Sequence, residues 1–551
     1  MTLLLFALAA VGKDGGGLPV TVTEELKIRY WTLDQRLPSH PDQPVFNYVE
    51  EVNRLSVHGQ GGGWQVWAQV DEVALGANRY YLDDVLYVER ELVDPSTTSW
   101  LPRSSWANLE KVALRRDTGW GQIHLGDFYA AFGRGVSLNL NRNVDIDVDT
   151  SIQGVKAVAH PGAWDLTAVA GQLNRQQVVL DNPNLGISGD LRHSVVGLRA
   201  ERFGLGVTNV GAHAVAWQFV DEQGLAEGLA ALGGPPDAVI GGLTVEAQGL
   251  LGLDWYAEAD HFSYPTNTLF GGEASEPGYA LYGSAAAYWG STVWLLEAKD
   301  YQNAERVNST LGRELYEVAV APTLEYERST SEDSAAALNS NDLVGARLRV
   351  DWSARDGLIP YASLGLFRDE ELGGLHFNRT PETIVHGLTG LELIQGHWAV
   401  LLNAGVRVDR RDQGEADYGA DRQVHGDLDL KFPLGHGYLG NISAGMEHFS
   451  WGVNPLQQSD YFEMENAFSI QKGSDVALIA YLDRTTNPLV DTTGNLSDDL
   501  YGALELQVKP SSALTAKVFY GAYKAGIRCS GGQCRTLPGF DGARVSLVAS
   551  F

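Results

Sequence analysis

The feature that most constrains the fold of this chain is a period-two pattern over segments about ten residues long, in which one set of alternate positions is apolar and the other set carries the charges. In residues 343–352 every even position is apolar, whereas three odd positions are charged, namely Arg347, Arg349 and Asp351. Because successive side chains of a β-strand point to opposite faces, this period of two predicts a strand with one apolar face and one face in water.

Two later segments, residues 398–409 and 423–432, repeat the pattern. Their odd positions include the charged residues Arg407, Asp409, Asp427 and Asp429. An Arg or Lys in the middle of a lipid-facing strand costs roughly 2–4 kcal/mol. The confinement of charge to one face therefore predicts a wall with lipid outside and water inside, and these charged residues become candidates for the lining of a lumen.

The end of the chain narrows this further. Residues 542–551 alternate in the same way and stop on Phe551. A C-terminal amphipathic strand that ends in Phe resembles that of transmembrane β-barrels in the outer membrane of Gram-negative bacteria. The resemblance implies that Phe551 lies at the periplasmic rim as an assembly signal for the barrel-assembly machinery, and that lipid and lipopolysaccharide surround the wall.

Counting back from Phe551, short turns alternate with long polar loops, as expected for short periplasmic turns and long extracellular loops. The expected fold is all-β: one large antiparallel up-and-down barrel over residues 13–551, with about 26 strands. Residues 20–31 must form a strand for the count to be even. Residues 315–328 are interpreted as two short strands around Pro322; if this segment folds inside, the count becomes 24. A soluble propeller is disfavoured because no repeat of about 40–50 residues is found.

The N-terminus predicts a signal peptide. Residues 3–11 are apolar but too short for a membrane-spanning helix, and small residues follow. Residues 1–12 are the expected signal peptide, with cleavage before Lys13 or Ala10. The alternative is a frayed N-terminus or a truncated gene start, because no Lys or Arg precedes the apolar run.

The net charge and the two cysteines limit which kinds of partner the protein is expected to have. The net charge is −29, from 40 basic and 69 acidic residues, which disfavours nucleic acid. An acidic lumen favours cations, although simple solubility of long loops also explains the excess of acidic residues.

Cys529 and Cys534 are separated by a short Gly-containing stretch, which predicts a disulfide in an extracellular loop of an exported protein. No further ligands lie near the two cysteines, so no metal or cofactor is expected.

A barrel of this size is roughly 50 Å across and needs something to narrow it. Residues 78–105 and 128–149 are candidates for loops folded into the lumen. In the second, Gly133 and Gly135 allow a sharp turn, and Arg134 can pair with a lumen carboxylate; the alternative is an ordinary extracellular hairpin. Further lumen candidates in this region are acidic, namely Asp127, Asp145, Asp147 and Asp149. The last three alternate as an acidic ladder but lack the Gly and distal Glu of a calcium loop.

The Gly-Asp-Phe-Tyr run at residues 126–129, the Phe-Gly-x-Gly run at 132–135 and the Pro-Thr-Leu run at 322–324 resemble a family of large outer-membrane barrels described as a domain of unknown function. Ala321 stands where a second Pro is expected. The resemblance covers about the central third of the chain and implies an outer-membrane barrel without naming an activity.

The expected function is a porin-like channel for small solutes or cations through a polar, acidic lumen. The alternative is a structural or secretion-associated barrel that binds a periplasmic or lipoprotein partner and conducts little. No Gly-x-Ser-x-Gly or His-Glu-x-x-His motif occurs, so an enzyme is not expected.

Overall fold

The fold is known from a computed structural model. It describes residues 19–33, 46–77, 105–143, 148–174, 193–219, 237–264, 277–304, 317–319, 342–369, 382–411, 421–450, 460–486, 500–524, 526–530, 533–537 and 540–551. Within these ranges every regular element is a strand, and no helix is long and apolar enough to cross a membrane.

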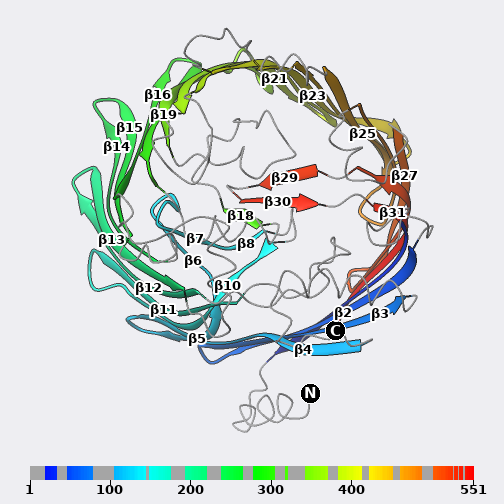
Figure 1. The fold of residues 1–551 in the computed structure, drawn as a ribbon, viewed down its shortest axis with the longest axis horizontal. Coiled ribbons are helices and arrows are strands. Elements are labelled where there is room, and N and C mark those ends of the chain that lie inside the picture. The colour runs from blue at the N-terminus through cyan, green and yellow to red at the C-terminus, as the bar shows by residue number, and fades with distance from the viewer. Residues whose placement is uncertain are drawn as a thin grey trace.

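Twenty-four antiparallel strands form one closed sheet (Figure 1). They are β1 (Val20–Leu33), β2 (Phe46–Gly61), β3 (Trp64–Ala77), β4 (Ser105–Thr118), β5 (Gly121–Phe128), β10 (Ser151–Ala159), β11 (Trp164–Asn174), β12 (His193–Leu205), β13 (Thr208–Phe219), β14 (Ala238–Leu250), β15 (Leu253–Ser263), β16 (Gly278–Trp289), β17 (Thr292–Gln302), β19 (Leu343–Trp352), β20 (Leu358–Asp369), β21 (Glu382–Gln395), β22 (Trp398–Arg411), β23 (Asp421–Gly435), β24 (Tyr438–Ser450), β25 (Tyr461–Lys472), β26 (Val476–Thr485), β27 (Leu500–Ser511), β28 (Leu514–Tyr523) and β31 (Phe540–Ser550).

The barrel closes between its first and last strands. β1 pairs with β31 from Thr23↔Ser550 to Trp31↔Gly542. Beyond this ladder the backbone of Phe551 exchanges two hydrogen bonds with Val22, so the last residue is part of the seam. The strand expected near residues 20–31 is confirmed as β1.

The expected count of 26 strands is wrong, and the alternative of 24 is correct. The error lies in residues 315–328, which were expected to add two strands to the wall. Their described part, β18 (Glu317–Ala319), is not a wall strand. It pairs instead with β30 (Gln533–Leu537) in a separate small sheet. Pro322 lies outside the described residues; because a Pro cannot donate to a ladder, its presence was already a reason to doubt two additional wall strands here.

The expected alternation of short turns and long connections is present. Neighbouring strands such as β2 and β3, β16 and β17, or β21 and β22 are joined at one end of the barrel by tight turns. Exposed aromatic side chains border these turns: Trp64, Trp120, Trp164, Trp289, Trp352, Trp398 and Tyr438. Such a girdle is typical of a barrel rim at a membrane interface.

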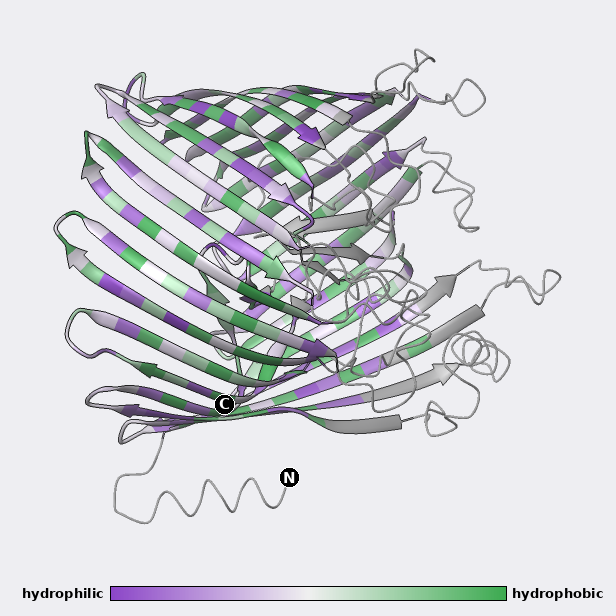
Figure 2. Ribbon diagram, turned by 60° about the vertical axis from the view of Figure 1, so that its left-hand side comes forward, coloured by the Kyte–Doolittle hydropathy of each residue, from purple (hydrophilic) through white to green (hydrophobic). Residues whose placement is uncertain are grey.

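The outer surface of the wall is apolar. In β22 and β23, Val400 lies opposite Leu430 and Leu402 lies opposite Leu428, so their side chains share a face. Leu402 is 45% exposed, and Leu547 of β31 is 36% exposed, although both are aliphatic. Figure 2 shows hydrophobic and hydrophilic residues alternating along the strands. The alternation is that of a strand between lipid and lumen.

Two small sets of strands lie inside the ring of wall strands in Figure 1. The first belongs to residues 129–150, here called the inner segment, and contains β6 (Ala130–Phe132), β7 (Leu138–Leu140), β8 (Arg142–Asn143) and β9 (Val148–Asp149). The second, here called the inner sheet, consists of β18, β29 (Gly526–Ser530) and β30. In the view down the barrel, the inner sheet lies near the middle of the ring (Figure 1).

The inner segment creates a hydrophobic core within the barrel. Phe132, Leu138 and Leu140 are buried, and they belong to one cluster with inward-facing residues of the wall strands β11 to β20. Those wall residues include Val195, Val215, Ile240 and Phe262. A polar lumen narrowed by infolded loops was expected, and on this side the infolded segment packs against apolar residues of the wall.

Candidate functional site

The candidate site is the lumen, which the inner segment divides into a filled side and a polar side. The inner segment follows β5 and precedes β10, two strands that pair with each other from Ile152↔Phe128 to Ala159↔Gly121. The segment therefore leaves the wall and returns to it at one place, where both of its ends can be held by the same group of side chains.

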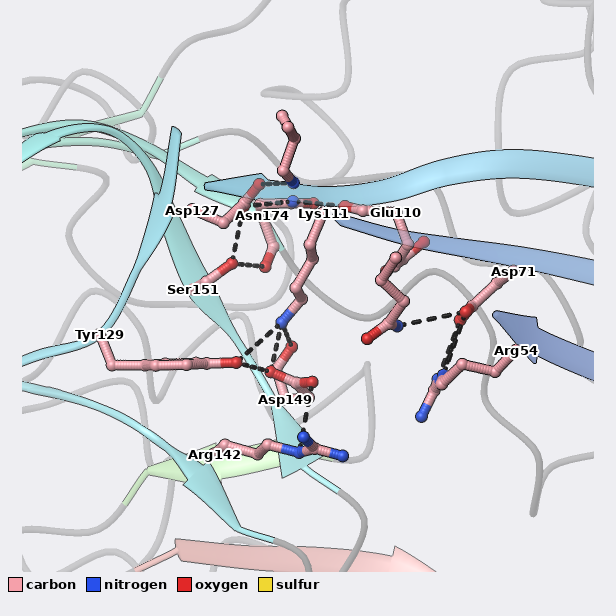
Figure 3. Close-up of polar contacts among 12 residues, drawn as sticks. Arg54, Asp71, Glu110, Lys111, Asp127, Tyr129, Arg142, Asp149, Ser151 and Asn174 are labelled. Carbon is pink, nitrogen blue, oxygen red and sulfur yellow. Dashed lines mark hydrogen bonds and ion pairs between the residues drawn. The ribbon is translucent and has the colours of Figure 1, made fainter. Parts of the chain in front are cut away.

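Asp127 holds the first of these ends (Figure 3). Its Oδ2 accepts a hydrogen bond from the backbone N–H of Val112 at 2.7 Å. Its Oδ1 accepts bonds from Ser151 Oγ at 2.9 Å and from Asn174 Nδ2 at 2.7 Å. The carboxylate thus ties β4, β5, β10 and β11 together, and three donors offset the cost of burying its charge.

Asp149 holds the second end (Figure 3). The Lys111 ammonium, which is fully buried, forms an ion pair with its carboxylate and donates to its backbone carbonyl at 3.0 Å. Tyr129 donates its hydroxyl to Asp149 Oδ1, and Arg142 Nε lies 3.7 Å from Oδ2. Burial, and then the Asp149 carboxylate, raise the pKa of Tyr129, so the phenol remains a donor.

The tip of the inner segment contacts the wall again at β15. The backbone N–H of Arg134 donates to Glu258 Oε2 at 2.7 Å, and the Arg134 guanidinium lies 4.6 Å from the centre of the Tyr256 ring. A contact between Arg134 and a lumen carboxylate was predicted; the backbone makes it, while the side chain stacks on an aromatic ring. Gly133 has a φ of +55°, a left-handed backbone conformation that favours glycine.

The polar side of the lumen carries the charged residues of β22 and β23. β19 contributes to both sides, because its Leu343 belongs to the apolar cluster whereas Arg349 and Asp351 form an ion pair. Arg349 donates two hydrogen bonds to Asp351 Oδ1, from Nε at 2.9 Å and from Nη2 at 2.7 Å. Arg407 donates two to Asp409, from Nε to Oδ1 and from Nη2 to Oδ2, both at 2.8 Å. Each pair joins residues two apart on one strand, so it lies along a single inward face.

The remaining predicted residues are distributed over the same face or lie outside the described ranges. Arg347 is buried in an ion pair with Glu297 of β17. Asp427 and Asp429 are half-buried on the inward face of β23. Asp145 and Asp147 lie outside the described residues, as does the loop candidate at 78–105 except for Ser105, the first residue of β4.

The cysteine pair is placed by its backbone. Cys529 and Cys534 lie directly opposite each other in the β29–β30 hairpin. The hairpin was expected to be an extracellular loop of its own, but β30 also pairs with β18, so it belongs to the inner sheet. The disulfide remains a prediction.

Sequence reasoning did not single out three lumen residues: His213 of β13, and Glu258 and Asp260 of β15. His213 Nε2 and Asp260 Oδ1 are 2.6 Å apart, and both side chains are buried. The alternation of Glu258 and Asp260 marks one strand face, but no local pattern links that face to a His more than forty residues away.

Comparisons with known proteins return likeness in structure only. No protein-family profile matches the chain, and no curated protein matches it. Among solved structures, OccK1 (OpdK) of Pseudomonas aeruginosa is 12% identical, with 75% of this chain and 98% of that chain covered and a TM-score of 0.38. The siderophore receptor PirA of Pseudomonas aeruginosa is 9% identical (97% and 80% covered, TM-score 0.44).

The translocation pore of the P pilus usher PapC is 10% identical, with 97% and 99% covered and a TM-score of 0.38. No residue role is carried over from structures this distant. The resemblance to a large outer-membrane barrel holds at the level of architecture, and no match supports the finer family assignment.

The location follows from the barrel itself. A closed, even-numbered antiparallel barrel with an apolar outer surface, short turns at one end and aromatic residues at that rim is the architecture of the Gram-negative outer membrane. The predicted localisation is confirmed.

Proposed function

We propose that this protein is an outer-membrane channel for small polar solutes or cations, which pass along the polar side of the lumen. The observation that carries the proposal is the unequal filling of the barrel. The inner segment is packed into an apolar core on one side, whereas charged residues on β19, β22 and β23 face inward on the other.

The charged side chains on this side of the lumen determine its preference for ions of one sign. Arg349 and Arg407 are each held by the carboxylate two residues further along the strand, and Asp427 and Asp429 add carboxylates on the neighbouring β23. With a net charge of −29 for the whole chain, the potential in the lumen favours cations.

The test is the selectivity of the purified barrel in a planar lipid bilayer under a salt gradient. Wild type is expected to conduct with a reversal potential of the sign for cations. Asp427→Asn with Asp429→Asn should shift that potential toward zero. Asp475→Asn, the same charge change in a short turn, should leave it unchanged. An unchanged potential in the double variant contradicts the assignment of these carboxylates to the pathway.

The second candidate function is a barrel that holds a periplasmic or lipoprotein partner and conducts little. The inner sheet favours it, because its three strands lie near the middle of the ring in the view down the barrel (Figure 1). The absence of conductance from correctly folded protein, together with a partner that remains bound on gentle extraction, would replace the channel proposal with this one. In both cases we propose that the barrel-assembly machinery recognises the terminal strand with Phe551.

A further inference from the structure

The tip of the inner segment meets the wall at a cluster of three residues whose side chains can bind metal. One ligand atom from each of His213, Glu258 and Asp260 lies within 4.8 Å of the other two. All three residues are buried; Glu258 is 2% exposed and Asp260 is 3% exposed.

The sheet register creates the space for this cluster. His213 of β13 lies opposite Gly242 of β14, and Gly242 lies opposite Asp260 of β15. A Cβ atom on Gly242 would lie 2.2 Å from Asp260 Oδ1 and 2.4 Å from His213 Nε2. The glycine therefore lets an imidazole and a carboxylate meet across the strand that separates them.

Two carboxylate oxygen atoms of the cluster accept no hydrogen bond. Glu258 Oε2 accepts bonds from Tyr256 Oη at 2.6 Å and from the Arg134 N–H at 2.7 Å. Asp260 Oδ1 contacts His213 Nε2. Glu258 Oε1 and Asp260 Oδ2 are buried without a hydrogen-bond partner. Two adjacent buried carboxylates with unsatisfied oxygens are costly unless a cation compensates them.

We propose that His213, Glu258 and Asp260 bind a divalent transition-metal ion such as Zn²⁺. One imidazole and two carboxylates form a mixed nitrogen and oxygen donor set, which suits Zn²⁺ better than Ca²⁺, because Ca²⁺ takes six or more oxygen ligands. Zinc binds such ligands at about 2.0–2.2 Å, so small rotations of the carboxylates bring the three atoms to a common centre. Two carboxylates and a neutral imidazole also balance the charge of a divalent ion.

The position of the site gives the ion a structural consequence. Glu258 is held by the backbone of Arg134 at the tip of the inner segment, and the Phe132 ring lies 6.1 Å from that of His213. The ion would therefore fasten the inner segment to β13 and β15. This inference does not depend on what passes through the barrel.

The experiment measures metal content and ligand identity in the full chain. The barrel is purified in detergent with a chelator, refolded with and without ZnCl₂, freed of unbound metal by gel filtration and analysed for zinc. Co²⁺ loading in parallel reports the coordination environment of the bound ion through its visible absorption. Folding of every sample is checked by the mobility difference between heated and unheated protein.

Wild type is expected to retain one zinc per chain, and His213→Gln and Asp260→Asn to lose at least tenfold in affinity. His261→Ala is the matched control, because it removes an exposed imidazole from the opposite face of β15 and should retain the metal. Folded wild type without zinc above the His213→Gln level would overturn the proposal. So would a cobalt spectrum that is the same in wild type and His213→Gln.

Discussion

At the scale of single residues, the face of the wall to which a side chain points decides which substitutions its position tolerates. Leu402 and Asn403 are neighbours on β22, but Leu402 lies on the apolar outer face and Asn403 lies on the face that carries Arg407. This difference is visible in the sequence, because every even position over residues 398–409 is apolar, whereas Asn403, Arg407 and Asp409 stand at odd positions.

Leu402→Arg is therefore expected to destabilise the membrane-inserted barrel by roughly 2–4 kcal/mol, whereas Asn403→Arg is expected to change its stability little. Urea titration of folding into lipid vesicles measures both values. Equal destabilisation by the two substitutions would contradict the assigned facing of β22.

A second prediction at this scale concerns the pair that anchors the inner segment. Lys111→Met leaves Asp149 buried without its ammonium partner, and loss of one member of a buried pair costs about 3–5 kcal/mol. Lys517→Met is the control, because Lys517 is an exposed wall lysine and its loss should cost within about 0.5 kcal/mol. The midpoint of urea unfolding compares the two variants; similar midpoints would show that the Lys111 pair does not stabilise the barrel.

At the scale of elements, the inner segment separates what the sequence predicts from what it does not. Its infolding was predicted from the glycines around Arg134, but the apolar core beneath it was not. A signal for that core does exist: Val239 and Ile240 are adjacent on β14, yet Val239 is exposed outside and Ile240 is buried inside. An apolar residue on both faces of a wall strand indicates that the inner face is also covered.

The turn at Gly133 offers a test of this docking. Gly133→Ala adds a Cβ only 2.1 Å from Glu258 Oε1 at a residue with φ of +55°. Gly162→Ala has a similar φ of +66° but no atom within 4 Å, so it shares the backbone strain of about 1–2 kcal/mol without the clash.

Gly133→Ala is expected to loosen the inner segment, which should raise single-channel conductance and expose the segment to protease. Gly162→Ala should match wild type in both measurements. If both variants behave alike, the contact between the tip and the wall does not hold the segment.

At the scale of the whole molecule, local patterns predicted the wall but not its strand count. The alternation and the short turns are local, and the strands they predicted are present. The pairing of β18 with β30 joins residues more than two hundred positions apart, so no local pattern reveals that it belongs inside. The cluster of His213, Glu258 and Asp260 was missed for the same reason, because it exists only through the register of three strands.

The last prediction tests whether the barrel closes at 24 strands, because only a closed barrel brings β1 next to β31. Leu26 lies directly opposite Leu547 across the seam, at the separation of paired strands, about 4.5–5.5 Å between Cα atoms. That separation suits a disulfide. With Cys529 and Cys534 replaced by Ser, Leu26→Cys with Leu547→Cys should form a cross-link in the folded barrel, seen as a mobility change that a reductant reverses. Leu26→Cys with Leu506→Cys should not, because β28 and β31 stand between β27 and β1. A cross-link in the second pair and none in the first would place the seam elsewhere, and the 24-strand ring would be wrong.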